Sequence, residues 1–222
     1  LAVSSPSRFD ATSLRLDHRG GTAWRLFGRA NHAPSSNSQR SFANGQNAFE
    51  LTTTTTTVGS TWTPGPRVAH DTRLNYSRSR GLFEFNVLPI DGAIIPDLDV
   101  LYPLFASRAS SRVNLQLTQA MPFQPGRSAA NFTIGKSLGN SQAQWNLVHT
   151  TTVVAGAHEL KAGFDWRRLH PGSDFSPYSF AYVFRSVEEA LATGIPVNVS
   201  MQAFAPETRF RVQNVSLFLQ DV

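Results

Sequence analysis

The stretch His158-Glu-Leu-Lys-Ala-Gly-Phe-Asp-Trp-Arg-Arg-Leu-His170 decides the fold predicted for this 222-residue chain. Every second residue from Leu160 to Trp166 is apolar, and the residues between them are polar or glycine. A period of two places the two sets on opposite faces of a β-strand. One face of this strand therefore suits an apolar environment and the other suits water.

The preceding segment, 142–154, shows the same alternation, with Ala143, Trp145 and Leu147 on one face. The short sequence Ala155-Gly156-Ala157 separates the two segments. Two alternating runs joined by a short, glycine-containing turn predict a β-hairpin.

Seven segments of the chain share this pattern. They are joined alternately by short turns, such as Arg19-Gly20-Gly21 and Thr63-Pro64-Gly65-Pro66, and by long connections rich in Ser, Asn, Pro and Gly. The predicted strands are 12–18, 22–31, 51–62, 67–80, 142–154, 158–170 and 209–222, and the long connections are 32–50, 81–141 and 171–208. Short turns on one side and long loops on the other are typical of outer-membrane barrels.

The strand lengths also fit a membrane. About ten residues at about 3.3 Å each, tilted by about 40°, rise about 25 Å, which is the height of the apolar band of such barrels. We therefore predict an all-β fold, an antiparallel up-and-down transmembrane β-barrel segment. Seven strands are fewer than the eight or more that close bacterial barrels, so we expect an incomplete barrel and a chain that is a fragment.

Two of the long connections contain predicted structure of their own. Ser186-Val187-Glu188-Glu189 matches a capping box, and Gly194 with Pro196 predicts that the helix ends after about two turns. Minor strands are expected at 113–118 and 131–136, where we predict that they extend the barrel wall above the membrane.

Five phrases in the sequence resemble the Oar-like TonB-dependent receptors, whose barrels follow a carboxypeptidase-regulatory-like domain. They are SLRLDHR at 13–19, WRLFGRAN at 24–31, LNYSRSRG at 74–81, HELKAGFDWRRL at 158–169 and NVSLFLQDV at 214–222. The resemblance covers nearly the whole chain. It identifies residues 1–222 as part of a receptor barrel domain, without the plug, the TonB box, the regulatory-like domain and the remaining strands.

The resemblance implies a barrel of roughly 22 strands in the bacterial outer membrane, energised through the TonB complex. The implied function is uptake or surface binding of a large ligand whose identity the sequence does not specify. The expected partners are therefore the TonB complex, through parts outside this segment, the transported ligand, and outer-membrane lipid or lipopolysaccharide. Two alternatives stay open, a passive porin-like barrel and a secreted soluble β-sandwich that acts as an adhesin or binding module.

The composition points away from catalysis. Cysteine is absent, and the six histidines lack the short spacings of metal ligands. Ser137 fits the G-x-S-x-G pattern of a nucleophile elbow, but a strand rather than a helix is predicted after it. Asp91, Asp97 and Asp99 lie close in the sequence without the pattern of a calcium-binding loop. We expect no catalytic, cofactor or metal site, and hence no enzyme.

The net charge of +5 comes from arginine, because only two of the 20 Lys and Arg residues are lysine. The arginines are scattered, so we expect no nucleic-acid partner. Eight of them are predicted near the outward strand ends: Arg25, Arg29, Arg78, Arg80, Arg167, Arg168, Arg209 and Arg211. They could contact lipopolysaccharide phosphates if they face outward, or line a ligand vestibule if they face inward. Arg78 and Arg168 alternate in step with the apolar residues of their strands, so these two are the better candidates for contact with lipid.

The predicted apolar faces also carry aromatic residues: Trp24, Trp62, Tyr76, Trp145 and Trp166. Aromatic girdles at the membrane interfaces use such residues. The core of a soluble sandwich would use them equally well, so they support a sheet without choosing between the two environments.

Overall fold

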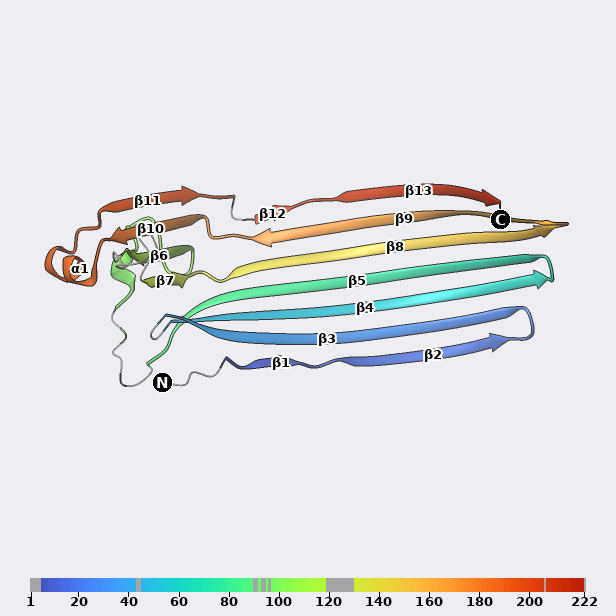
Figure 1. The fold of residues 1–222 in the computed structure, drawn as a ribbon, viewed down its shortest axis with the longest axis horizontal. Coiled ribbons are helices and arrows are strands. Elements are labelled where there is room, and N and C mark those ends of the chain that lie inside the picture. The colour runs from blue at the N-terminus through green and yellow to red at the C-terminus, as the bar shows by residue number, and fades with distance from the viewer. Residues whose placement is uncertain are drawn as a thin grey trace.

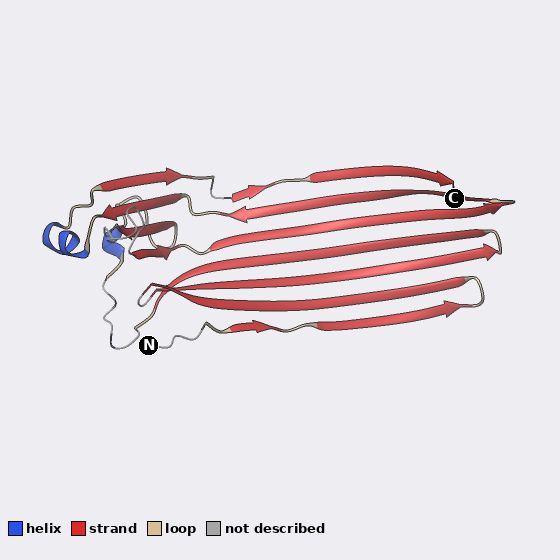
Figure 2. Cartoon of the chain, viewed as in Figure 1, coloured by secondary structure: helices blue, strands red, loops and turns tan. Residues whose placement is uncertain are grey.

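The computed structural model describes residues 5–42, 45–89, 92, 95, 97–118, 130–205 and 207–221, and most of them lie in strands (Figures 1 and 2). Strands in two sheets, one short helix and one 3-10 turn at Asp99–Leu101 make up the regular structure of these residues. The larger sheet, here called the wall, consists of β1 (Ser7–Phe9), β2 (Thr12–Gly20), β3 (Trp24–Phe42), β4 (Gly45–Gly65), β5 (Val68–Val87), β8 (Leu138–Ala155), β9 (His158–Asp174), β12 (Glu207–Arg209) and β13 (Val212–Asp221).

The wall is antiparallel and runs in chain order. β1 and β2 both pair with β3, followed by β4, β5, β8 and β9, and both β12 and β13 pair with β9. β1 and β2 lie end to end along β3, and β12 and β13 lie end to end along β9. Within the described ranges the nine strands of the wall therefore occupy seven side-by-side strand positions, here called lanes (Figure 1). The prediction of seven long crossings in an up-and-down order is confirmed.

The strands of the wall are longer than predicted. β4 has 21 residues and β5 has 20, where about ten would cross the membrane band. The predicted long loop at 32–50 is wrong, because β3 continues to Phe42 and β4 begins at Gly45. The wall therefore extends well past the height that a membrane crossing requires.

A change of parity along β5 explains why the sequence pattern seemed to end near Arg80. Between Val68 and Tyr76 the even-numbered residues include the large apolar side chains, whereas from Phe83 to Val87 the odd-numbered ones are apolar. Phe85 is almost fully buried on this second parity. Alternation thus inverts without a break in the strand, because the environment of each face changes at this height.

The tight turns lie at the end of the wall where β2 meets β3, β4 meets β5 and β8 meets β9 (Figure 1). Gly21 and Gly156 both have a φ of 66°, the left-handed conformation for which glycine is suited. The second turn is shifted from its predicted place at 63–66, because β4 continues to Gly65 and a register shift lies between Trp62 and Gly65.

The smaller sheet, here called the distal sheet, has the order β11-β10-β6-β7. Its strands are β6 (Ser111–Leu117), β7 (Ala130–Gly135), β10 (Tyr178–Phe184) and β11 (Asn198–Ala203). The predicted strands at 113–118 and 131–136 are confirmed, but the prediction that they extend the wall is wrong. They build a core of their own, in which Val113 and Ile134 are fully buried beside Leu98 and Phe180.

The distal sheet lies at the end of the wall opposite the tight turns (Figure 1). β7 contacts β3 and β5, and Val87 of β5 packs against the distal core. The guanidinium carbon of Arg112 lies 5.8 Å from the centre of the Phe85 ring. The distal sheet is therefore anchored on the face of β5 that carries Phe85.

The predicted loop helix is confirmed as α1 (Val187–Thr193). The hydroxyl of Ser186 accepts a hydrogen bond from the backbone N–H of Glu189 at 3.2 Å, and Gly194 ends the helix with a φ of 62°. Among the described residues, no helix is both long enough and apolar enough to span a membrane.

Candidate functional site

The two faces of the wall differ sharply in chemistry. One continuous row of paired residues, Leu16, Gly28, Val58, Leu74, Leu147, Trp166 and Val215, crosses all seven lanes and is apolar throughout. The adjoining row, Arg15, Arg29, Thr57, Asn75, Asn146, Arg167 and Asn214, is polar throughout. Adjacent residues of a strand point to opposite faces, so we call the two surfaces the Leu74 face and the Asn75 face.

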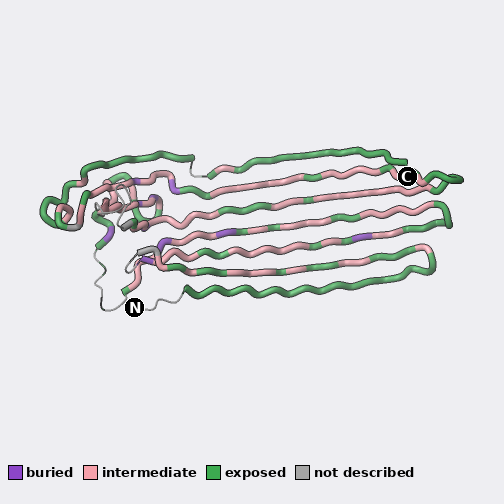
Figure 3. Tube along the Cα trace, in the orientation of Figure 1, coloured by how far each residue is buried: buried purple, intermediate pink, exposed green. Residues whose placement is uncertain are grey.

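The Leu74 face is exposed where it is most apolar. Leu16 is 68% exposed, Val58 54% and Val215 62%. Figure 3 shows how few residues along the wall are buried. A sandwich would bury this face under a second sheet, yet within the part of the chain that the structure describes the wall packs face to face on none. This face therefore requires an apolar environment supplied from outside the described chain.

The Asn75 face carries a network of short polar contacts. Arg15, Arg73 and Arg167 each form an ion pair with an aspartate two residues away, with N–O distances of 2.7, 3.0 and 2.9 Å. The side-chain amides of Asn31 and Asn75 donate to threonine hydroxyls at 2.8 Å. Exposed ion pairs contribute little to stability, so this network marks a face that is adapted to water.

Aromatic rings gather at two heights on the Leu74 face. Near the tight turns, Trp24 stacks on Trp62 at 5.4 Å between ring centroids, and Trp62 stacks on His70 at 5.1 Å. Farther along, Tyr76 lies 4.7 Å from Trp145. These five rings lie on one face, as do Trp166 and its neighbours in the apolar row. The predicted placement of the aromatic residues on the apolar parity is confirmed.

The structure separates the arginines that the sequence grouped together. Arg78, Arg80 and Arg168 have the parity of the Leu74 face, and so does Arg209, which is paired with Gly172. Arg167 lies on the Asn75 face, where its guanidinium donates to Asp165. Arg211 lies between β12 and β13. Vestibule lining therefore remains a prediction for Arg167, and lipid contact remains one for Arg78 and Arg168.

Two of the eight arginines were misplaced by sequence reasoning. Arg25 is the second residue of β3, directly after a tight turn, and Arg29 lies only four residues farther on in a strand of 19 residues. Their predicted position near the outward strand ends is wrong. For Arg29 the cause is that the alternating pattern ended near residue 31, whereas the strand continues to Phe42; Arg25 already lay close to the turn in the predicted strand 22–31.

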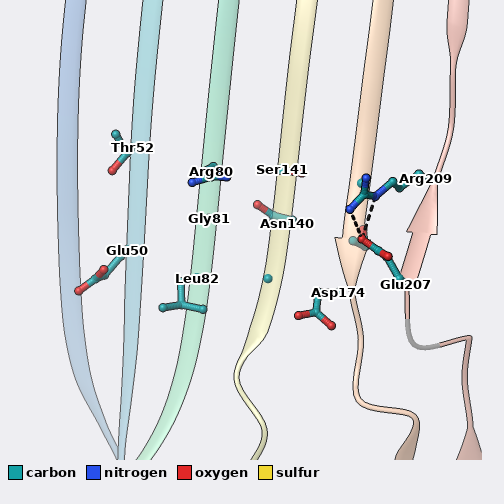
Figure 4. A pocket seen from close by; sticks show the side chains of 13 residues that line it. Glu50, Thr52, Arg80, Gly81, Leu82, Asn140, Ser141, Asp174, Glu207 and Arg209 are labelled. Carbon is teal, nitrogen blue, oxygen red and sulfur yellow. Dashed lines mark hydrogen bonds and ion pairs between the residues drawn. The ribbon is translucent and has the colours of Figure 1, made fainter. Parts of the chain in front are cut away.

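A groove of about 410 Å³ opens on the Leu74 face beyond the aromatic rings (Figure 4). Its floor is formed by small residues on the central strands, Gly139 and Ser141 on β8 and Gly172 on β9. Arg80 lies on one side, and Arg209, which forms an ion pair with Glu207, lies on the other. Small residues between two long cationic side chains account for the hollow.

A second groove of about 480 Å³ adjoins the first on the side of the aromatic rings. It shares Arg80, Ser141, Gly172 and Arg209 with the first groove and adds Tyr76, Arg78, Ala143, His170 and Phe210. Its lining therefore changes from apolar near Tyr76 to cationic near Arg80. Sequence reasoning missed both grooves because Gly139 and Gly172 were assigned to long loops.

The described residues offer no obvious reaction centre. No group of three His, Asp or Glu side chains within them is placed to hold a metal ion. Ser137 lies in the short connection between β7 and β8, so a strand follows it where a nucleophile elbow needs a helix. Asp97 accepts a hydrogen bond from the backbone N–H of Asp99, and Asp91 lies outside the described residues.

A family model, described as outer membrane beta barrel domain, matches residues 2–222. The chain belongs to the outer membrane beta barrel domain family. Its location is therefore the bacterial outer membrane, and the soluble sandwich considered from the sequence is excluded.

A solved structure has the same fold: the crystal structure of the outer membrane transporter YddB from Escherichia coli. The TM-score is 0.59 at 9% sequence identity, over 96% of this chain and 25% of the other. The chain thus spans a quarter of the length of that transporter. No curated protein matches the sequence. Membership of the family assigns the Leu74 face to lipid and the Asn75 face to the barrel interior.

Proposed function

We propose that this segment is part of the wall of a TonB-dependent outer-membrane transporter or receptor that takes up or binds a large ligand at the cell surface. The observation that carries the proposal is the pair of uniform rows, apolar on the Leu74 face and polar on the Asn75 face, across seven lanes. Such a wall separates lipid from a polar interior. Likeness to the fold of an outer-membrane transporter over 96% of the chain adds support.

The position of the distal sheet fits a receptor better than an open pore. It is attached through Phe85, Val87 and Arg112 on the side of the wall that the Asn75 face lines. The tight turns of bacterial barrels face the periplasm, so the distal sheet lies at the extracellular end. There it covers part of the interior surface and offers loops to a ligand.

The main alternative is a passive porin-like barrel. Electrical recording from the full-length protein in planar bilayers distinguishes the two. A barrel with an internal plug is expected to give no steady open channel, whereas a porin gives a constant conductance. The full-length protein should also bind the purified C-terminal domain of TonB; steady conductance together with no TonB binding would refute the proposal.

A further inference from the structure

Three arginines on the Leu74 face form no ion pair with a carboxylate, in contrast to three of the arginines on the other face. On the Asn75 face, Arg15, Arg73 and Arg167 are each paired with an aspartate of the same strand. Within the described ranges, no carboxylate forms an ion pair with Arg78, Arg80 or Arg168. A guanidinium on a lipid-facing surface is costly unless an anion or water meets it.

The height of these arginines identifies where such an anion lies. Arg78 is ten residues from Val68, the first residue of β5 after its tight turn, and Arg168 is ten residues from His158, the first of β9. Ten residues of tilted strand rise about 25 Å, the full height of the apolar band. Both residues thus lie at the outer boundary of the hydrocarbon layer: Arg168 is in the row of Tyr76 and Trp145, and Arg78 is in the next row beyond them.

The lateral arrangement suits a ligand with more than one charge. The pairing order places Arg78 on β5 beside Ala143 on β8, which pairs with His170 on β9. Two strand spacings, about 10 Å, separate β5 from β9. Nε of Arg168 donates to Nε2 of His170 at 2.8 Å, and His170 lines the second groove.

The second groove, which Arg78, Arg80 and His170 line, is amphipathic along its length. Tyr76 lines its end nearest the membrane, Arg78 and Ala143 form the next row, and Arg80 lies in the row beyond. Among the described residues that line this groove there is no carboxylate; Glu50, Asp174 and Glu207 line the adjoining first groove, where Glu207 is bonded to Arg209 and Asp174 to Lys136. Such a site fits a molecule with acyl chains below and phosphates above, because guanidinium binds phosphate through two parallel hydrogen bonds.

We propose that Arg78 and Arg168, with Arg80 beside them, bind the phosphate groups of lipopolysaccharide in the outer leaflet. This site depends on the orientation of the wall in the membrane and is independent of what the barrel transports. The bound lipid would cover the Leu74 face at the height where this face changes from apolar to charged.

Binding of purified bisphosphorylated lipid A to the delipidated full-length protein, measured by native mass spectrometry, tests the proposal. The double substitution Arg78→Ala with Arg168→Ala should weaken binding at least about tenfold, equivalent to about 1.4 kcal/mol. Arg73→Ala, on the same strand but facing the interior in an ion pair with Asp71, is the matched control and should leave binding unchanged. Arg78→Lys with Arg168→Lys should retain part of the affinity, because the charge remains without the bidentate geometry.

Two further probes define the ligand. Lipid A without phosphates should bind the wild-type protein weakly, and phosphatidylglycerol should compete poorly. The idea is overturned if the double alanine variant binds like wild type while migrating as a folded barrel in unheated gels, or if the dephosphorylated lipid binds equally well. Equal binding of phosphatidylglycerol would replace lipopolysaccharide by anionic phospholipid in general, which also contradicts the proposal.

Discussion

Phe27 lies directly over the bare backbone of Gly59 on the Asn75 face of the wall, where a β-carbon added to Gly59 would come within 2.1 Å of the phenyl ring. The guanidinium of Arg15 in turn lies 4.6 Å from the centre of the same ring. A ring that covers a strand glycine restores packing that the glycine cannot supply. The interior surface therefore has no room for a side chain larger than glycine at position 59 unless Phe27 moves.

Gly59→Ala should destabilise the full-length barrel by about 1–3 kcal/mol, because the new methyl group displaces Phe27 and overpacks the site. The measurement is the urea midpoint followed by intrinsic fluorescence in detergent. Gly28→Ala is the control, since a β-carbon there meets nothing within 4 Å, and it should be neutral or slightly stabilising. Equal effects of the two substitutions would contradict the packing described.

Leu74→Arg and Asn75→Arg test the assignment of the two faces with neighbouring residues. Leu74→Arg places a charge in the lipid and should cost about 2–4 kcal/mol, the range for charges near the bilayer midplane. Asn75→Arg loses the hydrogen bond to Thr57 and should cost only about 1 kcal/mol. Reversible unfolding in lipid vesicles measures both, and the reverse ranking would exchange the two faces.

Sequence reasoning worked where each face kept one environment along a strand. Between Leu160 and Trp166 the alternation gives the strand, its lipid face and its polar face correctly. The same reasoning failed beyond Arg80, where the apolar parity passes to Phe83, Phe85 and Val87 because the strand leaves the lipid and packs against the distal sheet. When the apolar residues are expected at every second position along a whole strand, such an inversion looks like the end of the strand.

The grooves were beyond prediction for a different reason. Arg80, Ser141 and Gly172 are far apart in sequence and form one row only through the pairing of β5, β8 and β9. Register depends on turn geometry and on the long connections, which carry no alternating signal. The parity of Arg78 and Arg168 could be read from the sequence, but their neighbours on the adjoining strands and their lack of a carboxylate partner required the structure.

The phenol of Tyr102 should lose its proton only at an unusually high pH. Burial raises the pKa of Tyr102 to about 12 from its ordinary value of 10, with Arg108 opposing and Asp99 reinforcing the shift. The raised pKa means that its contribution to stability is fully present below about pH 10 and is lost as the pH rises through about 12. The difference in tyrosinate absorbance between wild type and Tyr102→Phe measures this titration. A midpoint near 10 would contradict the burial of this side chain.

Gly135→Ala should loosen the distal sheet while leaving the wall intact. Gly135 has a φ of 116°, and a β-carbon there would lie 2.2 Å from the carbonyl oxygen of Ser111. Left-handed strain and a clash with backbone together should cost on the order of 3 kcal/mol. The damage should remain local because the buried residues of that core, Leu98, Val113, Ile134 and Phe180, all lie outside the wall.

Hydrogen exchange of the full-length protein separates the local effect from a global one. Gly135→Ala should speed exchange in Ser111–Leu117 and Tyr178–Phe184 and leave Val68–Tyr76 protected, because those two strands pair with each other and carry the distal core. Gly156→Ala is the control: it also requires a positive φ, 66°, but its β-carbon meets nothing within 4 Å. Its cost should be only about 1–2 kcal/mol and should appear at the β8–β9 turn. Loss of protection in both sheets for Gly135→Ala would mean that the distal sheet and the wall fold as one cooperative unit.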